Sequence, residues 1–267
     1  MIVTISKLAC NPCVVGSSPT LPLFFNLCNM LVISDIHARS FYKSVLENTT
    51  DKIIFLGDYE DPYPHEGITP EKSIDVMMEI FSFAQDNPDR VILLLGNHSY
   101  PYYKKFRGES RYDWRNAKTL EQIYDEFRDL FKIAYWDEET QTMFTHAGIN
   151  KKWWDSLELP IDWTPKQIQD YLNNLALTHN SYDLLREISR YRGGWNWNGS
   201  CIWADVHEHL ALKQDECIPF KQIFGHSQLE KTGNFIHQDN WWMCDSRAIF
   251  EYDGETLKLY NNVNSEQ

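Results

Sequence analysis

The feature of this sequence that most constrains its fold is a set of apolar runs that each stop at polar side chains. The runs "VISDIHAR" (32–39), "IIFLGDYED" (53–61) and "VILLLGNHS" (91–99) share this arrangement. Their polar endings are Asp35 and His37, Asp58 and Asp61, and Asn97 and His98. Because the runs are rich in β-branched residues and leucine and do not alternate with polar residues, they indicate strands buried on both faces of a sheet.

The segments between these runs predict a parallel βαβαβ unit. We expect strands at 30–34, 52–57 and 90–95, and helices at 38–48 and 70–86, where apolar residues have helical spacing. Strands that alternate with helices favour a parallel sheet with right-handed crossovers. In such a sheet, the loops that follow the strands meet at one crevice, where ligands bind. The polar endings are therefore expected to line one shared site.

The second half of the chain predicts two helical regions, a hairpin and several late strands. Residues 117–131 are expected to form an amphipathic helix, and 165–190 a helical region. A hairpin is expected between 132–136 and 141–145. The late strands are expected to form a second sheet and lie near 221–224, 234–237, 241–245, 248–252 and 256–260.

Two of these later segments add imidazoles at the same kind of position. "MFTHAG" places His146 after a strand, and "IFGHSQ" does the same for His226. A single strand-terminal Asp is more often a turn residue than a ligand, but Gly57, Gly96 and Gly225 precede three of the polar endings and permit close backbone approach. The pooled donors are Asp35, Asp58, Asn97, His37, His146 and His226. Mixed oxygen and nitrogen donors suit Mn, Fe or Zn better than Ca or Mg.

Composition excludes several classes of protein. A chain of 267 residues with 43% apolar content can bury one sizeable core, and it contains no apolar run long enough to cross a bilayer. The formal net charge of −13 disfavours binding to a nucleic-acid backbone. Six cysteines are too few for a disulfide framework in a chain of this length, which favours the cytoplasm.

The first 29 residues differ in composition from the rest of the chain. They carry one charge, Lys7, and half of the cysteines. The residues at 16–19, Gly-Ser-Ser-Pro, interrupt what would have to be the continuous apolar core of a signal peptide, so secretion is not expected. Cys10 and Cys13 lack a second pair at zinc-finger spacing. Because "VVGSSPT" also resembles an in-frame translation of a transfer RNA T-arm, we expect 1–29 to be an unstructured extension, Met30 to be the biological start, and 30–267 to form a single domain.

The ordered motifs "DIH", "GDYED", "GNH", "THAG" and "GHS" resemble those of the calcineurin-like metallophosphoesterases. Over residues 30 to about 250 the chain is most similar to the phosphoprotein phosphatase branch, which includes serine/threonine phosphatases and diadenosine tetraphosphatase, and "CIWAD" at 201–205 resembles the tryptophan-acid segment of that branch. The resemblance implies an α/β fold, a four-layer αββα sandwich of two mixed sheets flanked by helices, with a two-metal centre. The implied ligands are Asp35 and His37 for one metal, Asn97, His146 and His226 for the other, and Asp58 as the bridge.

The chain departs from the pattern of this branch at three positions. Ala38 stands where the branch usually has glycine, Ser99 where it has glutamate, and Pro62 where it has an arginine that clamps phosphate. A guanidinium that binds phosphate through two hydrogen bonds is not easily replaced. Our leading substitute is Arg192, in "YRGGW", followed by Arg39, Arg111 and Arg247.

The resemblance and the residues together predict a binuclear-metal phosphohydrolase that cleaves phosphomonoesters, with phosphoserine and phosphothreonine proteins as the first substrate class. The expected cofactors are two divalent transition-metal ions, manganese before iron or zinc, which activate a bridging hydroxide that attacks phosphorus. His98 is left over as general acid, with Asp61 as its orienting partner. The alternative is hydrolysis of dinucleoside polyphosphates or other nucleotides. A more distant alternative is a catalytically weak, metal-containing binding module.

Three other features are expected to be structural. The tryptophans at 153–154, 195, 197 and 241–242 are expected to fill the core and rim more often than to stack a base. His207-Glu-His209 is expected on a solvated helix. "KKFRGESRYDWR" at 104–115 is expected to be a solvated loop, with a border on the substrate cleft as the alternative.

Overall fold

The structure is a computed structural model that describes most of the chain from Asn29 onward. The described ranges are 29–46, 49–160, 162–178, 183–213 and 216–260. Apart from Asn29, the predicted extension lies outside the described residues. No helix within the described ranges is both long and apolar enough to cross a membrane.

One sheet contains the three strands whose polar endings stand out in the sequence. Its order is β11-β10-β1-β2-β3-β4. The strands are β1 (Met30–Ile33), β2 (Lys52–Phe55), β3 (Val91–Leu94), β4 (Phe131–Lys132), β10 (Ile249–Tyr252) and β11 (Leu257–Leu259). β1, β2, β3 and β4 are parallel neighbours, which confirms the expected βαβαβ unit.

The second sheet has the order β5-β6-β7-β9-β8. Its strands are β5 (Ala134–Asp137), β6 (Thr142–Thr145), β7 (Lys221–Phe224), β8 (Ile236–Gln238) and β9 (Trp241–Met243). β5 and β6 form the predicted antiparallel hairpin. The expectation that all late strands join this sheet is wrong for β10 and β11, because β10 pairs antiparallel with β1 in the first sheet, with Ile249 opposite Ile33.

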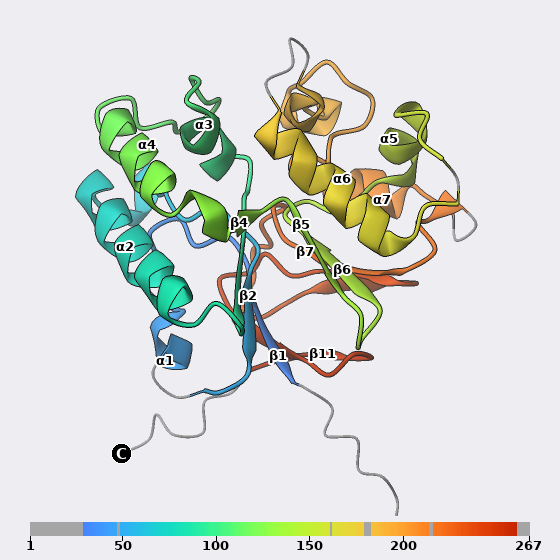
Figure 1. Cartoon of the computed structure of the whole chain (residues 1–267), viewed down its shortest axis with the longest axis horizontal. Coiled ribbons are helices and arrows are strands. Elements are labelled where there is room, and N and C mark those ends of the chain that lie inside the picture. Colours follow the sequence, from blue (N-terminus) through green and yellow to red (C-terminus); the bar gives the residue numbers. More distant parts are fainter. Residues whose placement is uncertain (1–28, 47–48, 161, 179–182, 214–215, 261–267) are drawn as a thin grey trace, which may run out of the picture.

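The helices lie on the outer faces of the two sheets (Figure 1). Their bounds are α1 (Lys43–Leu46), α2 (Pro70–Asp86), α3 (Ser99–Lys104), α4 (Ala117–Glu126), α5 (Lys151–Ser156), α6 (Pro165–Leu177) and α7 (Val206–Leu210). The 3₁₀ turns are η1 (Pro64–Glu66), η2 (Arg128–Leu130), η3 (Leu184–Arg186) and η4 (Arg190–Arg192). Figure 1 shows α2 and α4 beside the first sheet, and α5 and α6 on the far side of the second.

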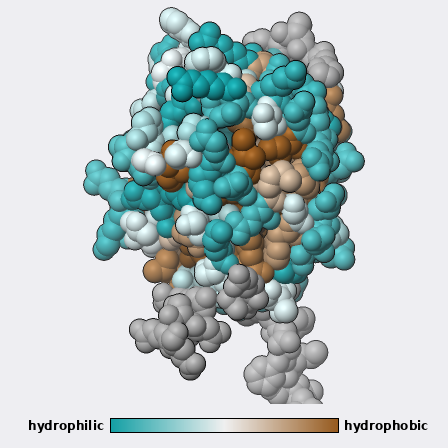
Figure 2. All heavy atoms as spheres, turned by 90° about the vertical axis from the view of Figure 1, so that its left-hand side faces the viewer, coloured by the Kyte–Doolittle hydropathy of each residue, from teal (hydrophilic) through white to brown (hydrophobic). Residues whose placement is uncertain are grey.

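Alternate side chains of the central strands pack in opposite directions. Leu31 and Ile33 belong to the core that includes Ile80 of α2. Met30 and Val32 instead pack in the core between the sheets, with Phe144 and Ile223 of the second sheet. The resulting order of layers, helix, sheet, sheet, helix, confirms the four-layer αββα sandwich. Seen from the side of α2 and α4, most of the surface is hydrophilic, with hydrophobic side chains exposed in patches (Figure 2).

Capping signals in the sequence mark where the long helices begin better than where the short helices begin. α2 spans the predicted 70–86, and Thr69 precedes Pro70 as its N-cap, although the Thr69 side chain makes no capping bond. α6 begins with a capping box between Thr164 and Gln167. Within the described part of the predicted 38–48, α1 covers four residues, because residues 38–42 form turns and irregular backbone that follow the site.

Candidate metal and phosphate site

The carboxyl ends of the strands meet at one cleft with a volume of about 260 Å³. β1, β2, β3 and β7 are each followed by site residues, and β6 is followed by His146. Side chains from both sheets and two long connections line the cleft, namely Asp35, His37, Asp58, Tyr63, Asn97, His98, Ser110, Arg111, Arg192, Trp203 and His226. The cleft therefore contains five of the six predicted metal ligands, and His146 lies directly behind it in contact with Asp58 and Asn97.

Several site residues adopt left-handed backbone conformations. The φ angles are +43° at His37, +53° at Asp58, +56° at Asp61 and +69° at His226. Such conformations cost a non-glycine residue roughly 1–3 kcal/mol each and persist where the surroundings impose them. Glycine is required at Gly225, because a Cβ atom there would overlap side-chain oxygens of the residues at 34 and 35. The backbone is therefore bent to bring these side chains together.

Asp58 is the centre of the polar cluster. One of its oxygens, Oδ2, lies 3.4 Å from His146 Nε2 and 3.9 Å from His37 Nε2. The other, Oδ1, accepts a hydrogen bond of 2.9 Å from the backbone N–H of His98. Two groups of potential metal ligands share this carboxylate: His37, Asp58 and His98, and Asp58, His146 and His226.

Asn97 joins the second group through its side-chain oxygen, which lies 3.0 Å from His146 Nε2. His146 Nε2 is also 3.1 Å from His226 Nδ1. Asp35 lines the same cleft but is in neither group; its Oδ2 accepts the backbone N–H of His226 at 3.0 Å and a short bond from Ser34 Oγ. The structure thus brings all six predicted ligands together, with Asp35 bonded to the backbone of a neighbour.

The imidazoles are oriented as metal ligands usually are. His37 Nδ1 lies 2.8 Å from the carbonyl oxygen of Glu60, and His146 Nδ1 lies 2.9 Å from that of Leu56. These bonds direct each Nε2 toward Asp58, which is the usual arrangement behind a metal-binding histidine. His226 Nε2 is buried and has no hydrogen-bond partner among the described residues. An unpaired buried nitrogen is costly unless a ligand satisfies it, so the residues present fit a metal centre.

Burial and charge set the ionisation of this cluster. Burial lowers the pKa of His37 and of His226 well below the usual value, which keeps both imidazoles neutral and able to coordinate. Burial alone would raise the pKa of Asp58, but the neighbouring imidazoles, above all that of His146, outweigh it and the pKa lies well below its usual value. Burial would lower the pKa of His146, yet Asp58 and Asp35 raise it to about 9. The site therefore holds an ionised carboxylate at its centre.

His98 is held by a chain of buried polar groups. Its Nδ1 lies 2.9 Å from Asp61 Oδ2, and the other Asp61 oxygen accepts a bond of 2.7 Å from the Tyr102 hydroxyl. The Tyr102 hydroxyl in turn accepts the backbone N–H of Asp113 at 2.7 Å. This chain fixes the ring of His98 with Nε2 facing the cleft.

Arg111 enters the cleft from the loop between α3 and α4. Its guanidinium carbon lies 3.7 Å from the centroid of the Tyr63 ring, close enough for a cation–π contact. The terminal nitrogens donate to the carbonyl oxygen of Asp61 at 2.6 Å and to His98 Nε2 at 2.9 Å. Arg111 thus holds a fixed position above the polar cluster, directly against the residue that follows Pro62.

Arg192 lines the cleft from the other long connection, between α6 and α7. Its Nε lies 2.7 Å from Asp205 Oδ2, and its NH2 group donates to Ser227 Oγ at 2.7 Å. Arg39 instead pairs with Glu66 at 2.9 Å, and Arg247 donates to the carbonyl oxygen of Glu230. Of the four candidate arginines, Arg111 and Arg192 line the cleft; Arg39 and Arg247 do not.

Sequence reasoning underrated two parts of this region. Arg111 comes from the 104–115 segment, for which the sequence favours a solvated loop with a border on the substrate cleft as the alternative, and the position of Arg111 fits that alternative. Tyr63 also lines the cleft and has no signal in the sequence beyond its position after Pro62. The expectation of a solvated helix at 207–209 is wrong for Glu208 and His209, which are buried. Glu208 caps α7 and His209 bonds the carbonyl oxygen of Ala147, and neither belongs to the groups of potential metal ligands found among the described residues.

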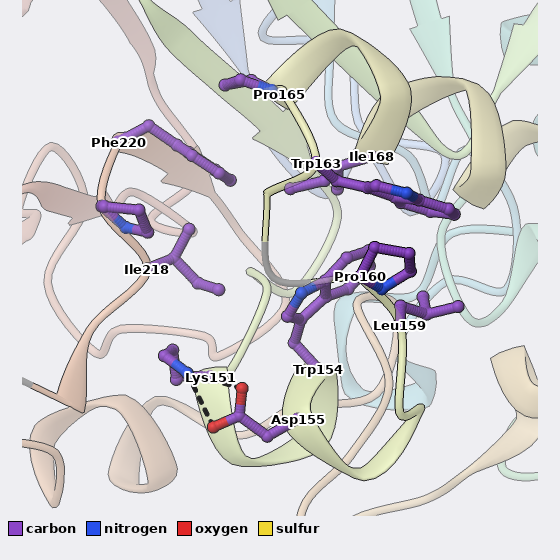
Figure 3. Close-up of a pocket in the computed structure, with 11 residues that line it drawn as sticks. Lys151, Trp154, Asp155, Leu159, Pro160, Trp163, Pro165, Ile168, Ile218 and Phe220 are labelled. Carbon is purple, nitrogen blue, oxygen red and sulfur yellow. Dashed lines mark hydrogen bonds and ion pairs between the residues drawn. The ribbon is translucent and has the colours of Figure 1, made fainter.

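A second pocket of about 370 Å³ lies between α5, the start of α6 and the segment before β7. Figure 3 shows Trp154 and Trp163 on one wall, Ile218 and Phe220 on the other, and the Lys151–Asp155 ion pair at one end. This pocket is mostly apolar and contains none of the predicted site residues. Its chemistry does not suit phosphate or a metal ion.

Comparisons with known proteins agree with this geometry. The family model described as calcineurin-like phosphoesterase matches residues 29–230. A cold-active protein-tyrosine phosphatase from a psychrophilic Shewanella species is structurally similar, with a TM-score of 0.57 and 14% identity over 87% of this chain and 80% of that one. A protein serine/threonine phosphatase from Saccharomyces cerevisiae has a TM-score of 0.51 and 11% identity over 87% of this chain and 78% of that one. No curated protein sequence matches the chain significantly.

Proposed function

The chain belongs to the calcineurin-like phosphoesterase family of metal-dependent phosphoesterases, and we propose that it hydrolyses phosphomonoesters, first of all phosphoserine and phosphothreonine in proteins. The observation that carries the proposal is that a buried carboxylate–imidazole cluster, His98 and two arginines face one another in the same cleft. Such a set can bind a phosphate group, hold metal ions beneath it and protonate its leaving group.

The residues that would hold two cations are divided by Asp58, which faces both groups. We assign Asp35 and His37 to one cation and Asn97, His146 and His226 to the other, with Asp58 shared between them. Mixed carboxylate, amide and imidazole donors favour manganese, iron or zinc, and we place manganese first. When bound, a pair of such ions activates water as the nucleophile and polarises the phosphate oxygens.

Arg111 and Arg192 would bind the phosphate oxygens. Both guanidiniums line the cleft, and each keeps part of its donor set on the protein, which fixes its direction. Arginine suits this role because its planar donors match pairs of phosphate oxygens. In this assignment Arg111 takes the place of the arginine that is missing at Pro62, and Arg192 acts beside it.

His98 would protonate the leaving oxygen. Because a guanidinium only donates, the bond from Arg111 makes His98 Nε2 an acceptor and places the ring proton on Nδ1, toward Asp61. Once the Arg111 donors are engaged by a phosphate group, His98 Nε2 can take a proton from solvent and pass it to the leaving oxygen. Asp61 then stabilises the charged ring.

Hydrolysis of dinucleoside polyphosphates or other nucleotides is the second candidate. It is favoured by exposed tryptophans close to Arg192 in the chain: Trp195 is 94% exposed and Trp197 is 73% exposed. Indole rings at a surface can stack on bases.

Cys201 and Cys244 are buried thiols, which supports the proposal that the protein works in the reducing cytoplasm.

A substrate screen tests the proposed function. Phosphopeptides, nucleotides, dinucleoside polyphosphates and p-nitrophenyl phosphate are each incubated with the metal-free protein and Mn, Fe, Zn or Mg in turn. We expect metal-dependent release of phosphate from phosphoserine and phosphothreonine peptides, highest with Mn. A clear preference for nucleotides would support the second candidate, and no hydrolysis of any ester with any metal would reject the proposal.

A further inference from the structure

Both connections that supply an arginine to the cleft also carry an arginine–tryptophan pair on their outer surface. On the α3–α4 loop, Arg115 lies 5.2 Å from the ring centroid of Trp114, which is 72% exposed. On the α6–α7 connection, Arg190 lies 3.4 Å from the ring centroid of Trp197, which is 73% exposed. The α3–α4 loop and the α6–α7 connection are drawn in green and in yellow to orange at the top of Figure 1.

These pairs are close in the chain to the arginines that line the cleft. Arg115 follows Arg111 by four residues, and Arg190 begins the 3₁₀ turn that ends at Arg192. The two connections also touch, because Arg186 lies 3.5 Å from Glu109. The pairs therefore lie on two segments that contact each other and that each supply an arginine to the cleft.

The arginines of the two pairs form no ion pair among the described residues, although the Asp113 carboxylate accepts the backbone N–H of Arg115 at 3.1 Å. Among the described residues, neither Arg115 nor Arg190 has a carboxylate ion-pair partner, whereas Arg186 pairs with Glu109 and Arg192 with Asp205. Both side chains are exposed in a protein whose formal net charge is −13. Exposed arginines without an ion-pair partner favour an anionic partner.

We propose that Trp114–Arg115 and Arg190–Trp197 are two docking arms that bind acidic side chains on either side of the phosphorylated residue in a polypeptide substrate. This inference rests on the proposed phosphomonoesterase function and names the substrate class of the same cleft. Each indole ring packs against a guanidinium and leaves the hydrogen-bond donors of that guanidinium free for carboxylates. Because the two arms lie on different connections, a ligand that contacts both of them has to be extended, as a peptide chain is.

Stacking of a nucleobase is the less favoured use of this surface. One face of Trp197 is already covered by Arg190, and Tyr191 is stacked on His207, with ring centroids 5.5 Å apart and planes at 16°. These rings therefore offer fewer free faces than their exposure suggests. Arginine and tryptophan are also the residues most often found at the energetic centres of protein–protein interfaces.

Steady-state kinetics of Arg115→Gln, Arg190→Gln and the double variant test the docking arms. The substrates are two phosphoserine peptides of equal length, one with aspartates and one with alanines around the phosphorylated residue, and p-nitrophenyl phosphate. We expect each substitution to raise KM for the acidic peptide by roughly two- to fivefold with little change in kcat, and the double variant by about tenfold. The alanine peptide and p-nitrophenyl phosphate should be unaffected, and added salt should remove the preference of the unaltered protein.

Arg90→Gln is the matched control, because Arg90 also lies over an aromatic ring, Phe83 at 5.0 Å, but stands at the amino end of β3, away from the cleft. Binding of the labelled peptides, followed by fluorescence anisotropy, supplies a readout that needs no turnover. Equal affinity of the unaltered protein for both peptides would overturn the proposal, and so would equal losses on p-nitrophenyl phosphate. A preference for nucleotides that Trp114→Ala and Trp197→Ala abolish would replace it with base stacking. If no ester is hydrolysed but the acidic peptide still binds through the arms, the proposed function fails and the docking inference stands.

Discussion

His98 Nδ1 lies 2.9 Å from Asp61 Oδ2, and both groups are almost completely buried. Tyr102 holds the second Asp61 oxygen, so the carboxylate cannot turn away from the ring. Because the backbone N–H of His98 is also bonded to Asp58, the histidine is tied at once to the proposed metal cluster and to its own orienting carboxylate. This arrangement suits a proton donor whose direction has to match the bond that breaks.

His98→Ala should lower kcat for phosphoserine peptides by about 10² to 10⁴, because an alkoxide leaving group needs a proton. Activity on p-nitrophenyl phosphate should be largely retained, since its phenolate leaves readily. Asp61→Asn should give a milder version of the same pattern, and the double variant should lose little more than His98→Ala. Equal losses on both esters with unchanged metal content would contradict the acid role.

Asp58→Asn should reduce metal content and activity together. Elemental analysis of the unaltered protein is expected to approach two transition-metal ions per chain, and a shared carboxylate serves both. Asp75→Asn on α2, where the aspartate side chain is 73% exposed, is the matched control and should change neither quantity. One tightly bound ion with full activity would be inconsistent with the assignment.

Arg111→Ala should raise KM for phosphomonoesters and the inhibition constant of inorganic phosphate in parallel, each by roughly 10- to 100-fold, because charge-assisted hydrogen bonds contribute about 1.5–3 kcal/mol. Arg111→Lys keeps the charge but not the paired donors and should recover only part of the loss. Arg192→Ala should act in the same direction. Unchanged phosphate inhibition in either alanine variant would remove that arginine from the site.

Asp137→Asn should destabilise the fold at neutral pH and not in acid. Burial would raise the pKa of Asp137, but hydrogen bonds from Lys52, at 2.6 Å, and from Thr140 outweigh it and lower the pKa below 3.8. A lowered folded-state pKa stabilises the protein above the unfolded value, and the contribution is lost as the pH falls through the folded value. Thermal unfolding at pH 7 should show a loss of about 1–3 kcal/mol. The loss should shrink toward zero near pH 2, and a loss that persists there would contradict this assignment.

A chain that begins at Met30 should match the full chain in melting temperature and turnover. The expectation rests on the change in composition at that residue and on the absence of zinc-finger partners for Cys10 and Cys13 in the sequence. Differential scanning calorimetry and phosphate release, measured side by side on the two chains, check it. A clear drop in either would show that the first 29 residues contribute to the folded protein.

The sequence predicts the first sheet and the position of the cleft well, because both follow from local patterns. A buried parallel strand needs a continuous apolar run, so β1, β2 and β3 are visible in the sequence, and their polar endings must meet at one edge. The sheet to which β10 belongs is not visible in the sequence, because three of its four residues are buried and such an apolar strand would suit an edge of either sheet. Its pairing with β1 is a contact between distant parts of the chain.

The loops around the site were harder to predict than its ligands. Arg111 has a left-handed backbone, with φ of +59°, and its place above the cleft depends on the ring of Tyr63. Neither property has a local sequence signal, because glycine rather than arginine marks left-handed positions. The sequence favours a solvated helix at His207-Glu-His209 because residues two apart on a helix point to different faces, yet His209 bonds Ala147 and is buried.

The position of β1 between β2 and β10 also bears on how the protein is made. Among the described strands, β1 is the first to leave the ribosome, and the strand that pairs with its second edge begins only at Ile249. At the usual rate of translation, that edge stays unpaired for roughly 10–40 s. A nascent chain with an open, apolar edge is prone to pair with other chains, so chaperone contact during synthesis and the folding yield at high expression depend on residues 249–260, the last 12 residues of the described fold.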